Sequence, residues 1–252
     1  MLPNLMNMAS TSEIGHAKNL ASFQNLIVCV RDYGTTYTTN NPELQLPQLE
    51  ALSLEAQNAL SALIIKRSNY DISVNNRQDI FSGLKKLSTR IMSVLQIARV
   101  DKRLMDDAKS YHRKLHGKRA KTKVKMEEQV GVALPNRHSV SQQSYTQLMQ
   151  HFEGLLSILN HAATYNPSSA DLQLSNLIAM RADLEFKTQA VVSAESQLIN
   201  ARILRDNILY KRPNALVEIG NAVKLEVRTL FGHNSEEYNK IKKISFKRPK
   251  AL

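Results

Sequence analysis

The sequence has no Trp, one Cys, eight Gly and seven Pro in 252 residues. A single Cys excludes a scaffold held by disulfide bonds within the chain, and it is compatible with a reducing cytoplasm. Cys29 lies between Val28 and Val30 and is interpreted as a small buried apolar residue. Aromatic residues make up only 6% of the chain, which argues against a β-sandwich or a barrel.

Long apolar runs are also missing. No stretch reaches the ~18 apolar residues that a simple membrane-spanning helix needs. The first twelve residues have neither the basic start nor the apolar run of a secretory signal peptide. No Pro occurs between Pro47 and Pro135, and that stretch is rich in helix-forming residues. We therefore expect an all-α protein, cytoplasmic and without a transmembrane segment.

The sequence does contain a long internal repeat. The segment Thr36–Leu46 (TYTTNNPELQL) returns 128 residues later as Thr164–Leu174 (TYNPSSADLQL). Apolar positions before and after this segment recur at the same distance. A period of this length indicates a duplicated folding unit. We predict two tandem three-helix repeats that form an elongated helical bundle with a pseudo-twofold relation.

Apolar residues spaced three and four apart predict three helices in each copy. They cover about 12–33, 47–81 and 84–115 in the first copy, and about 140–163, 173–210 and 214–231 in the second. Gly83 and Pro213 are expected to make a tight turn into the third helix of each copy. A kink in one very long helix is the alternative at both places. A short helix is expected from Ser235 through Lys243.

The two copies differ in length, because the first has 13 extra residues before its closing Gly117. As helix, these residues make nearly four turns, or roughly 20 Å, and predict an arm that projects beyond its twin. The predicted division is an N-terminal arm (1–11), repeat 1 with its basic extension (12–123), a linker (124–138), repeat 2 (139–238) and a basic C-terminal tail (239–252). The short linker favours two copies packed on each other; two independent three-helix domains are the alternative.

The formal net charge of +12 is concentrated in two segments. Arg99–Lys125 holds eleven Lys or Arg and three Asp, and the chain from Lys240 onward adds six more Lys or Arg. The rest of the chain is close to −2, so the basicity belongs to the ends of the two repeats. The residues predicted to bind nucleic acid or another acidic partner are Lys109, Arg113, Lys114, Lys118, Arg119, Lys121, Lys123, Lys125, Lys242, Lys243, Lys247 and Arg248.

A basic run of this kind favours sequence-independent nucleic-acid binding. Tyr111, His112 and His116 lie among the cations and are expected to stack on bases or donate to phosphates. No helix-turn-helix, zinc-finger, RRM or KH signature is present, which argues against base-specific recognition. The alternatives are a solvated basic face, binding to an acidic protein or an anionic membrane surface, self-assembly into a homo-oligomer, and helical pore formation.

No motif predicts catalysis, a cofactor or a metal. His112 and His116 have the i, i+4 spacing of metal ligands, but no acidic or Cys ligand is near them in the sequence and the surrounding cations would oppose a divalent ion. Two other polar pairs recur at the repeat distance. Arg77 and Arg205 are expected to be exposed or salt-bridged, and Tyr37 and Tyr165 to anchor the connectors through ring burial and a hydroxyl hydrogen bond. We therefore expect a non-enzymatic binding or scaffold protein.

Three segments resemble those of a group of uncharacterised all-helical bacterial proteins: the Thr-Tyr connectors, the stretch RKLHGKR at 113–119 and the stretch FGHNSEEY at 231–238. The resemblance covers most of the chain. It implies a duplicated helical architecture and no established activity, and it supplies no functional residues.

Overall fold

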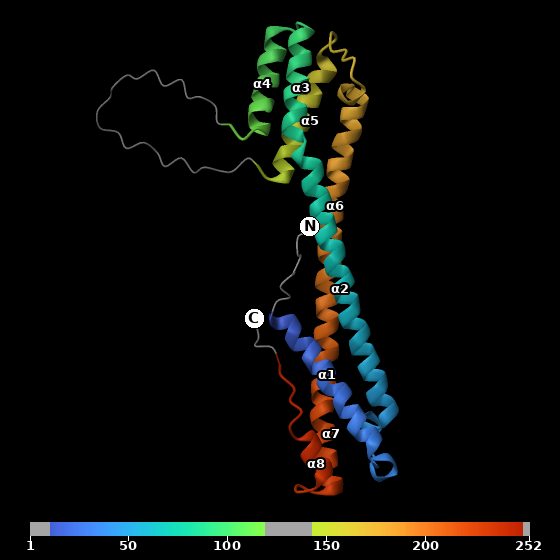
Figure 1. Ribbon diagram of the computed structural model, residues 1–252. Coiled ribbons are helices and arrows are strands. Elements are labelled where there is room, and N and C mark those ends of the chain that lie inside the picture. Colours follow the sequence, from blue (N-terminus) through green and yellow to red (C-terminus); the bar gives the residue numbers. More distant parts are fainter. Residues whose placement is uncertain (1–10, 119–142, 249–252) are drawn as a thin grey trace, which may run out of the picture. The chain divides into compact units, whose positions relative to one another are not determined.

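The computed structural model describes residues 11–118 and 143–248, and all their secondary structure is helical (Figure 1). The all-α class is therefore confirmed. The main helices are α1 (Thr11–Asp32), α2 (Leu46–Ser82), α3 (Leu84–Ile97), α4 (Lys102–Leu115), α5 (Tyr145–His161), α6 (Leu174–Asp206), α7 (Leu216–Phe231) and α8 (Glu236–Ile241). In this part of the chain, no helix has the length and apolar composition needed to cross a membrane. The predicted linker and Arg119, Lys121, Lys123 and Lys125 lie outside the described residues.

The prediction of a single helix over 84–115 is wrong, because the chain reverses at residues 98–101 and forms two helices, α3 and α4. Arg99 has a φ of 47°, in the left-handed region. Its N–H donates to Gln96 O at 3.2 Å, and the N–H of Val100 lies 3.5 Å from Leu95 O, a Schellman ending for α3. Asp101 then caps α4, since its carboxylate accepts from the N–H of Arg103 at 2.8 Å.

The prediction of a projecting arm is also wrong, because α4 folds back onto α3 and α5. Ala108 and Leu115 of α4 are fully buried there. Tyr111 of α4 packs against Gly154 of α5, where an added Cβ would sit 2.3 Å from the Tyr111 ring. The extra residues of the first copy therefore cover a core instead of extending away from it.

The structure also differs from the tight turns into a third helix that the sequence predicts at Gly83 and Pro213. Gly83 has helical angles (φ −76°, ψ −16°), and its carbonyl accepts from the N–H of Leu87 at 3.0 Å, so α3 continues the direction of α2. At the second place, α6 passes into a π-helical turn at Asn207–Lys211, and α7 begins after Asn214 (φ 59°). Figure 1 shows each third helix running onward from the long helix before it. The kinked alternative is therefore observed at Gly83, whereas at Pro213 residues 212–215 interrupt the helix before α7 begins.

The chain divides into two compact units, which are described separately. Unit 1 is residues 1–69 with 195–252, and unit 2 is residues 70–194. Unit 1 thus contains α1, the first part of α2, the end of α6, α7 and α8. Unit 2 contains the end of α2, α3, α4, α5 and the first part of α6. Neither unit corresponds to one predicted copy. In both units, the first helix along the chain belongs to the first predicted copy and the last helix belongs to the second. The repeat boundaries themselves stay a prediction from the sequence.

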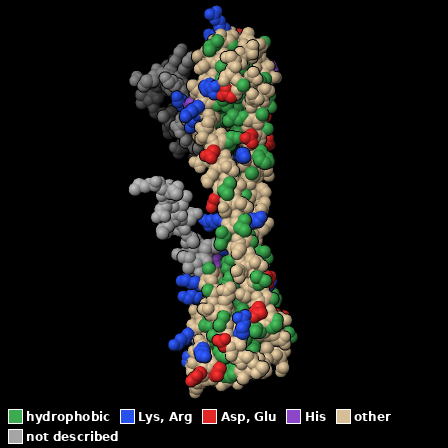
Figure 2. Space-filling view, turned by 45° about the vertical axis from the view of Figure 1, so that its right-hand side comes forward, with side chains coloured by type: hydrophobic (Ala, Val, Ile, Leu, Met, Phe, Trp, Pro, Cys, Tyr) green, Lys and Arg blue, Asp and Glu red, His purple; other side chains and the backbone are tan. Residues whose placement is uncertain are grey.

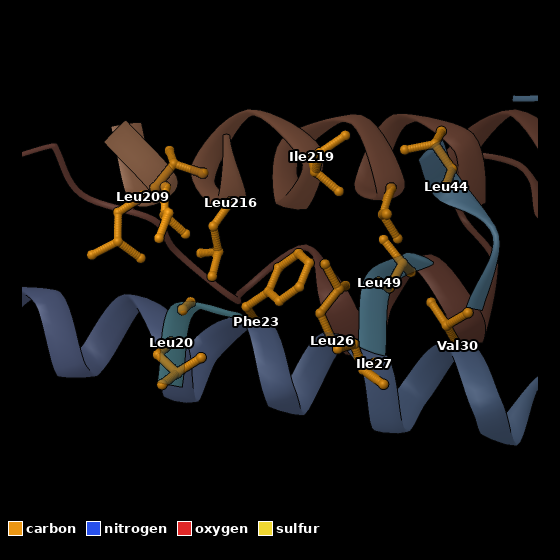
Figure 3. Close-up of a cluster of buried hydrophobic side chains, with 14 of the residues drawn as sticks. Leu20, Phe23, Leu26, Ile27, Val30, Leu44, Leu49, Leu209, Leu216 and Ile219 are labelled. Carbon is orange, nitrogen blue, oxygen red and sulfur yellow. The ribbon is translucent and has the colours of Figure 1, made fainter. Parts of the chain in front are cut away.

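The core of unit 1 forms between α1 and α7 (Figure 3). Phe23 and Leu26 of α1 are fully buried, and the Phe23 ring points toward the α7 side of the cluster. Leu49 of α2 and Leu216 of α7 complete the contact and are also fully buried. Cys29 is half-buried beside this core, and burial raises the pKa of its thiol, which agrees with a structural role.

The core of unit 2 packs α3, α4, α5 and α6 together. Its largest fully buried side chains are Phe152, Leu84, Ile91, Leu95, Leu115, Leu155, Leu177 and Leu184. Arg77 lies at its edge, with the guanidinium carbon 4.3 Å from the centroid of the Tyr145 ring. Its repeat equivalent in unit 1, Arg205, is buried and forms an ion pair with Asp206 at 2.9 Å. The salt-bridged role expected for this pair is confirmed for Arg205.

The two Thr-Tyr connectors have the same local structure, as predicted. The hydroxyl of Tyr37 donates to Leu44 O at 3.0 Å, and that of Tyr165 donates to Leu172 O at 2.8 Å. Burial raises the pKa of both hydroxyls to about 12. Each hydroxyl bridges seven residues of chain and fixes the reversal between two helices.

We expect Tyr37→Phe and Tyr165→Phe each to lower the free energy of unfolding by about 1 kcal/mol, because each leaves a carbonyl without its donor. Urea unfolding monitored by circular dichroism measures the change. The control is Tyr70→Phe, whose hydroxyl makes no hydrogen bond to the described residues and whose substitution should have little effect. Equal effects of all three substitutions would contradict this role of the connectors.

We expect Arg99→Gly to raise the free energy of unfolding by roughly 0.5–1 kcal/mol, because glycine adopts a positive φ without the steric cost that arginine carries. Ala98→Gly, at a neighbouring residue with helical angles, should lower it instead. The same unfolding measurement compares the two variants. A destabilised Arg99→Gly would show that the arginine side chain, and not the backbone angle, matters at this turn.

Candidate anion-binding surface

The reversal at residues 98–101 brings the start of α3 against the end of α4. The Nε2 atom of His116 lies 3.2 Å from Lys85 O, and the Nδ1 atom of His112 lies 3.2 Å from the hydroxyl of Ser88. Ser88 is fully buried, and its hydroxyl also donates to Lys85 O at 2.8 Å. These contacts fix the position of the last turn of α4 on α3.

Gly117 ends α4 in the way that the sequence predicts. Its φ is 71°, and its N–H donates to Lys114 O at 3.0 Å. The N–H of Lys118 donates to Arg113 O at the same distance, which completes a Schellman motif. The backbone that carries Lys118 is therefore held in place directly after the helix.

Five cations gather at this end of the α3–α4 hairpin, and we call them the α3–α4 cation cluster: Lys85, Lys86, Arg113, Lys114 and Lys118. Lys85, Lys86 and Lys118 are exposed, and the other two are half-buried. Within residues 11–118 and 143–248, none of the five has a carboxylate at ion-pair distance. Figure 2 shows Lys and Arg side chains beside His in the upper part of the molecule, where Figure 1 places α3 and α4.

The electrostatics of the hairpin are dominated by positive charge. From Leu84 to Lys118 the sequence contains ten Lys or Arg against three Asp. The pKa of His112 is lowered by burial, then by the nearby His116 and Lys118. The pKa of His151 on α5 is lowered by burial, then by Lys114. A bound anion would reduce this repulsion between like charges, whereas a bound metal cation would add to it.

The aromatic residues among the cations have structural contacts. The Tyr111 ring packs on Gly154, and Lys114 Nζ lies 5.0 Å from its centroid. The imidazoles of His112 and His116 are 4.3 Å apart and face α3. The sequence predicts that these rings stack on bases. Their contacts with α3 and α5 leave them unavailable for stacking. Among the described residues, no three His, Cys, Asp or Glu side chains come together as metal ligands.

The structure places the predicted binding residues in three groups. Arg113, Lys114 and Lys118 belong to the α3–α4 cation cluster, whereas Lys109 is paired with Asp106 at 3.0 Å. Arg119, Lys121, Lys123 and Lys125 lie outside the described residues. Lys242, Lys243, Lys247 and Arg248 belong to unit 1, where their side chains are exposed. The α4 group and the C-terminal group are thus parts of different units.

Sequence reasoning missed Lys85 and Lys86. They follow Gly83 and are 27 or more residues before Arg113, so the charge count alone does not join them to the basic run. The missed signal is Asp101, which has a helix-capping residue type at the start of the pattern DKRL. A helix start at this place breaks the third helix and allows α4 to fold back to Lys85.

No family model matches the sequence, and no curated protein or solved structure shows significant similarity to it. The comparisons therefore leave the resemblance to uncharacterised helical proteins as an expectation, and the candidate surface depends on its own geometry.

We expect the free energy of unfolding to fall as the pH drops below about 6.5, the ordinary pKa of histidine. The fold lowers the pKa of His112 and His151, so the unfolded chain binds more protons than the native one in this range. His112→Gln should reduce the loss of stability between pH 7 and pH 5, as measured by urea unfolding. His161→Gln on the exposed end of α5 is the control. An unchanged pH dependence in His112→Gln would contradict the assignment.

Proposed function

We propose that this protein is a non-enzymatic helical binding protein whose α3–α4 cation cluster holds the phosphate backbone of nucleic acid without reading its sequence. The observation that carries the proposal is the gathering of five cations, from α3, α4 and the residue after Gly117, with no carboxylate partner among the described residues. In the sequence, Arg119, Lys121, Lys123 and Lys125 follow this cluster directly and add four charges of the same sign.

The chemistry of the cluster favours phosphate over other partners. Four of its five members are Lys, which binds phosphate as a point charge without a fixed geometry. The residues that could read base edges or stack on bases are instead packed against α3 and α5. Phosphate contacts give affinity and position but carry no sequence information. Binding without sequence preference follows from this composition.

The duplicated architecture belongs to the same proposal. The two segments of unit 1 can be compared with unit 2 at the repeat distance of 128 residues. Residues 1–69 then correspond to 129–197, and residues 195–252 correspond to 67–124. Together, these two ranges nearly equal residues 70–194, which form unit 2. Equivalent residues of the long helices, Leu49 with Leu177 and Leu63 with Val191, are buried in both. This agreement supports two equivalent repeats with a pseudo-twofold relation. On this proposal, the protein is a symmetric scaffold in which only the first copy carries α4.

A second candidate is self-assembly, which the exposed apolar side chains of the long helices favour. In unit 1, Ile64 of α2 is 70% exposed and Ile203 of α6 is 52% exposed. In unit 2, Phe186 of α6 is 66% exposed and borders a shallow hollow with Ile80 and Met180. The apolar surface around Phe186 is contiguous, and contiguous exposed apolar patches are typical of interaction sites. Light scattering over a range of concentrations tests this candidate.

For nucleic-acid binding, we expect Lys85→Ala/Lys118→Ala to weaken the affinity for duplex DNA by about tenfold or more at 0.1 M salt. The slope of log affinity against log salt should fall by about 0.9 for each phosphate that the variant no longer neutralises. Filter binding over a salt series with two unrelated duplex sequences measures both quantities. The matched control is Lys102→Ala/Arg103→Ala, which removes two exposed charges at the other end of α4.

Two results would contradict the proposal. One is equal weakening in both double variants, which would make the effect one of net charge alone. The other is affinity that does not change with salt. Binding of polyglutamate with the same dependence on Lys85 and Lys118, together with no binding of DNA, would indicate an acidic protein partner instead.

A further inference from the structure

The C-terminal strip, residues 244–247, occupies a groove in unit 1 between α1 and α7. The Phe246 ring lies on α7 at Gly220, where an added Cβ would be 2.5 Å from Phe246 Cζ. On the other side, the centroids of the Phe246 and Phe23 rings are 6.4 Å apart in an edge-to-face arrangement. Figure 3 shows Phe23 extending from α1 into this space between the helices. The groove is therefore an aromatic pocket with a bare patch of helix as its floor.

The backbone of the strip is held by side chains. Asn19 is 2% exposed; its Oδ1 accepts from the N–H of Lys247 at 3.0 Å, and its Nδ2 donates to Lys247 O at 2.7 Å. Tyr210 supports this amide, because its hydroxyl lies 3.0 Å from Asn19 Nδ2 and 2.7 Å from the Nδ1 of His16. Lys224 Nζ donates to Ile244 O at 2.8 Å. A side-chain amide that pairs with both polar groups of one residue recognises extended backbone, as a neighbouring strand does.

Backbone-to-backbone hydrogen bonds contribute little to holding the strip in the fold. In the described part of the chain, its backbone-to-backbone hydrogen bond is the one from Ile244 to Ile241 O at 2.9 Å. In unit 2, the side of the core next to α5 is covered by α4, a complete helix whose Tyr111 rests on Gly154. Unit 1 uses a short extended segment for the same purpose. Such a segment can leave its groove without unwinding a helix.

We propose that this groove is a binding site for an extended segment with the pattern apolar-x-aromatic-basic, and that the strip of a second copy of the chain binds in it. The contacts across the two chains are then those seen within one chain. Phe246 packs on Gly220, Lys224 binds the carbonyl of Ile244, and Asn19 binds the backbone of Lys247. A second copy is the occupant because it offers the same segment that the groove already fits. Exchange of an identical element is a low-cost route to a dimer. The exposed Lys242 and Lys243 before the strip provide the connection.

Two full-length variants test the exchange as a complementary pair. Gly220→Leu fills its own groove with a side chain and releases an intact strip, because Gly220 lies under the Phe246 ring. Phe246→Ala keeps an intact groove but has a strip without the ring. We expect each variant alone to sediment as a monomer at micromolar concentration and an equimolar mixture to form a 1:1 dimer. A mixture that stays monomeric, with both variants helical by circular dichroism, would overturn the proposal.

The control for the pair is Gly15→Leu mixed with Phe246→Ala. Gly15 lies on α1 with no atom within 4 Å of its added Cβ, so this variant keeps its own strip bound. It should give less than a tenth of the dimer that Gly220→Leu gives. Equal dimer formation would also overturn the proposal, because association would then not need a released strip.

A peptide measurement keeps the proposal testable if either variant fails to fold. A fluorescent peptide of residues 242–248 is added to the unmodified chain at up to millimolar concentration, the range set by a short tether. Saturable binding is expected, with at least a tenfold loss in Asn19→Ala protein and in a peptide carrying Phe246→Ala. Absence of binding, or binding that both changes leave intact, would overturn the proposal.

Discussion

The structure depends on the direction of the chain at Gly83 and after the π-helical turn at Asn207–Lys211, where α3 and α7 run onward from the long helices before them (Figure 1). At Gly83 the backbone angles remain helical, and the carbonyl keeps its hydrogen bond to Leu87. Because α3 does not turn back onto α2, its apolar face must find partners elsewhere, and it joins a core with α4, α5 and α6. For the same reason α7 packs on α1. Each hydrophobic core therefore combines helices from both predicted copies.

Each unit needs one more segment to close its core, and the two units use different ones. Unit 2 uses α4, whose Tyr111 rests on Gly154, and unit 1 uses the C-terminal strip, whose Phe246 rests on Gly220. In both places, a glycine in a helix allows an aromatic ring to approach the backbone. The two basic groups of the chain are attached to these closing segments. The proposed phosphate surface and the proposed exchange site thus both lie where the two predicted copies differ most.

Much of the local structure could be predicted from the sequence. The bounds of α1, α2 and α7 follow from apolar residues spaced three and four apart, and the roles of Tyr37 and Tyr165 follow from their place beside the connector prolines. The ends of α3 and the direction of the chain at Gly83 could not be predicted from the sequence. Glycine fits a tight turn and a helix equally well, so only the packing of α3 in the core of unit 2 decides between them. The turn at Arg99 lacks the glycine that usually marks a left-handed residue, and the contact of Lys85 with His116 depends on that turn.

Separation of the two predicted copies tests the central claim most directly. A protease site placed within residues 119–142 would give one fragment with α1–α4 and another with α5–α8. If each core needs both copies, neither purified fragment should show cooperative thermal unfolding alone, and mixing them should restore the helical signal and a single 1:1 complex. Cooperative unfolding of each isolated fragment, at the temperature of the intact chain, would show two independent three-helix domains and contradict the account.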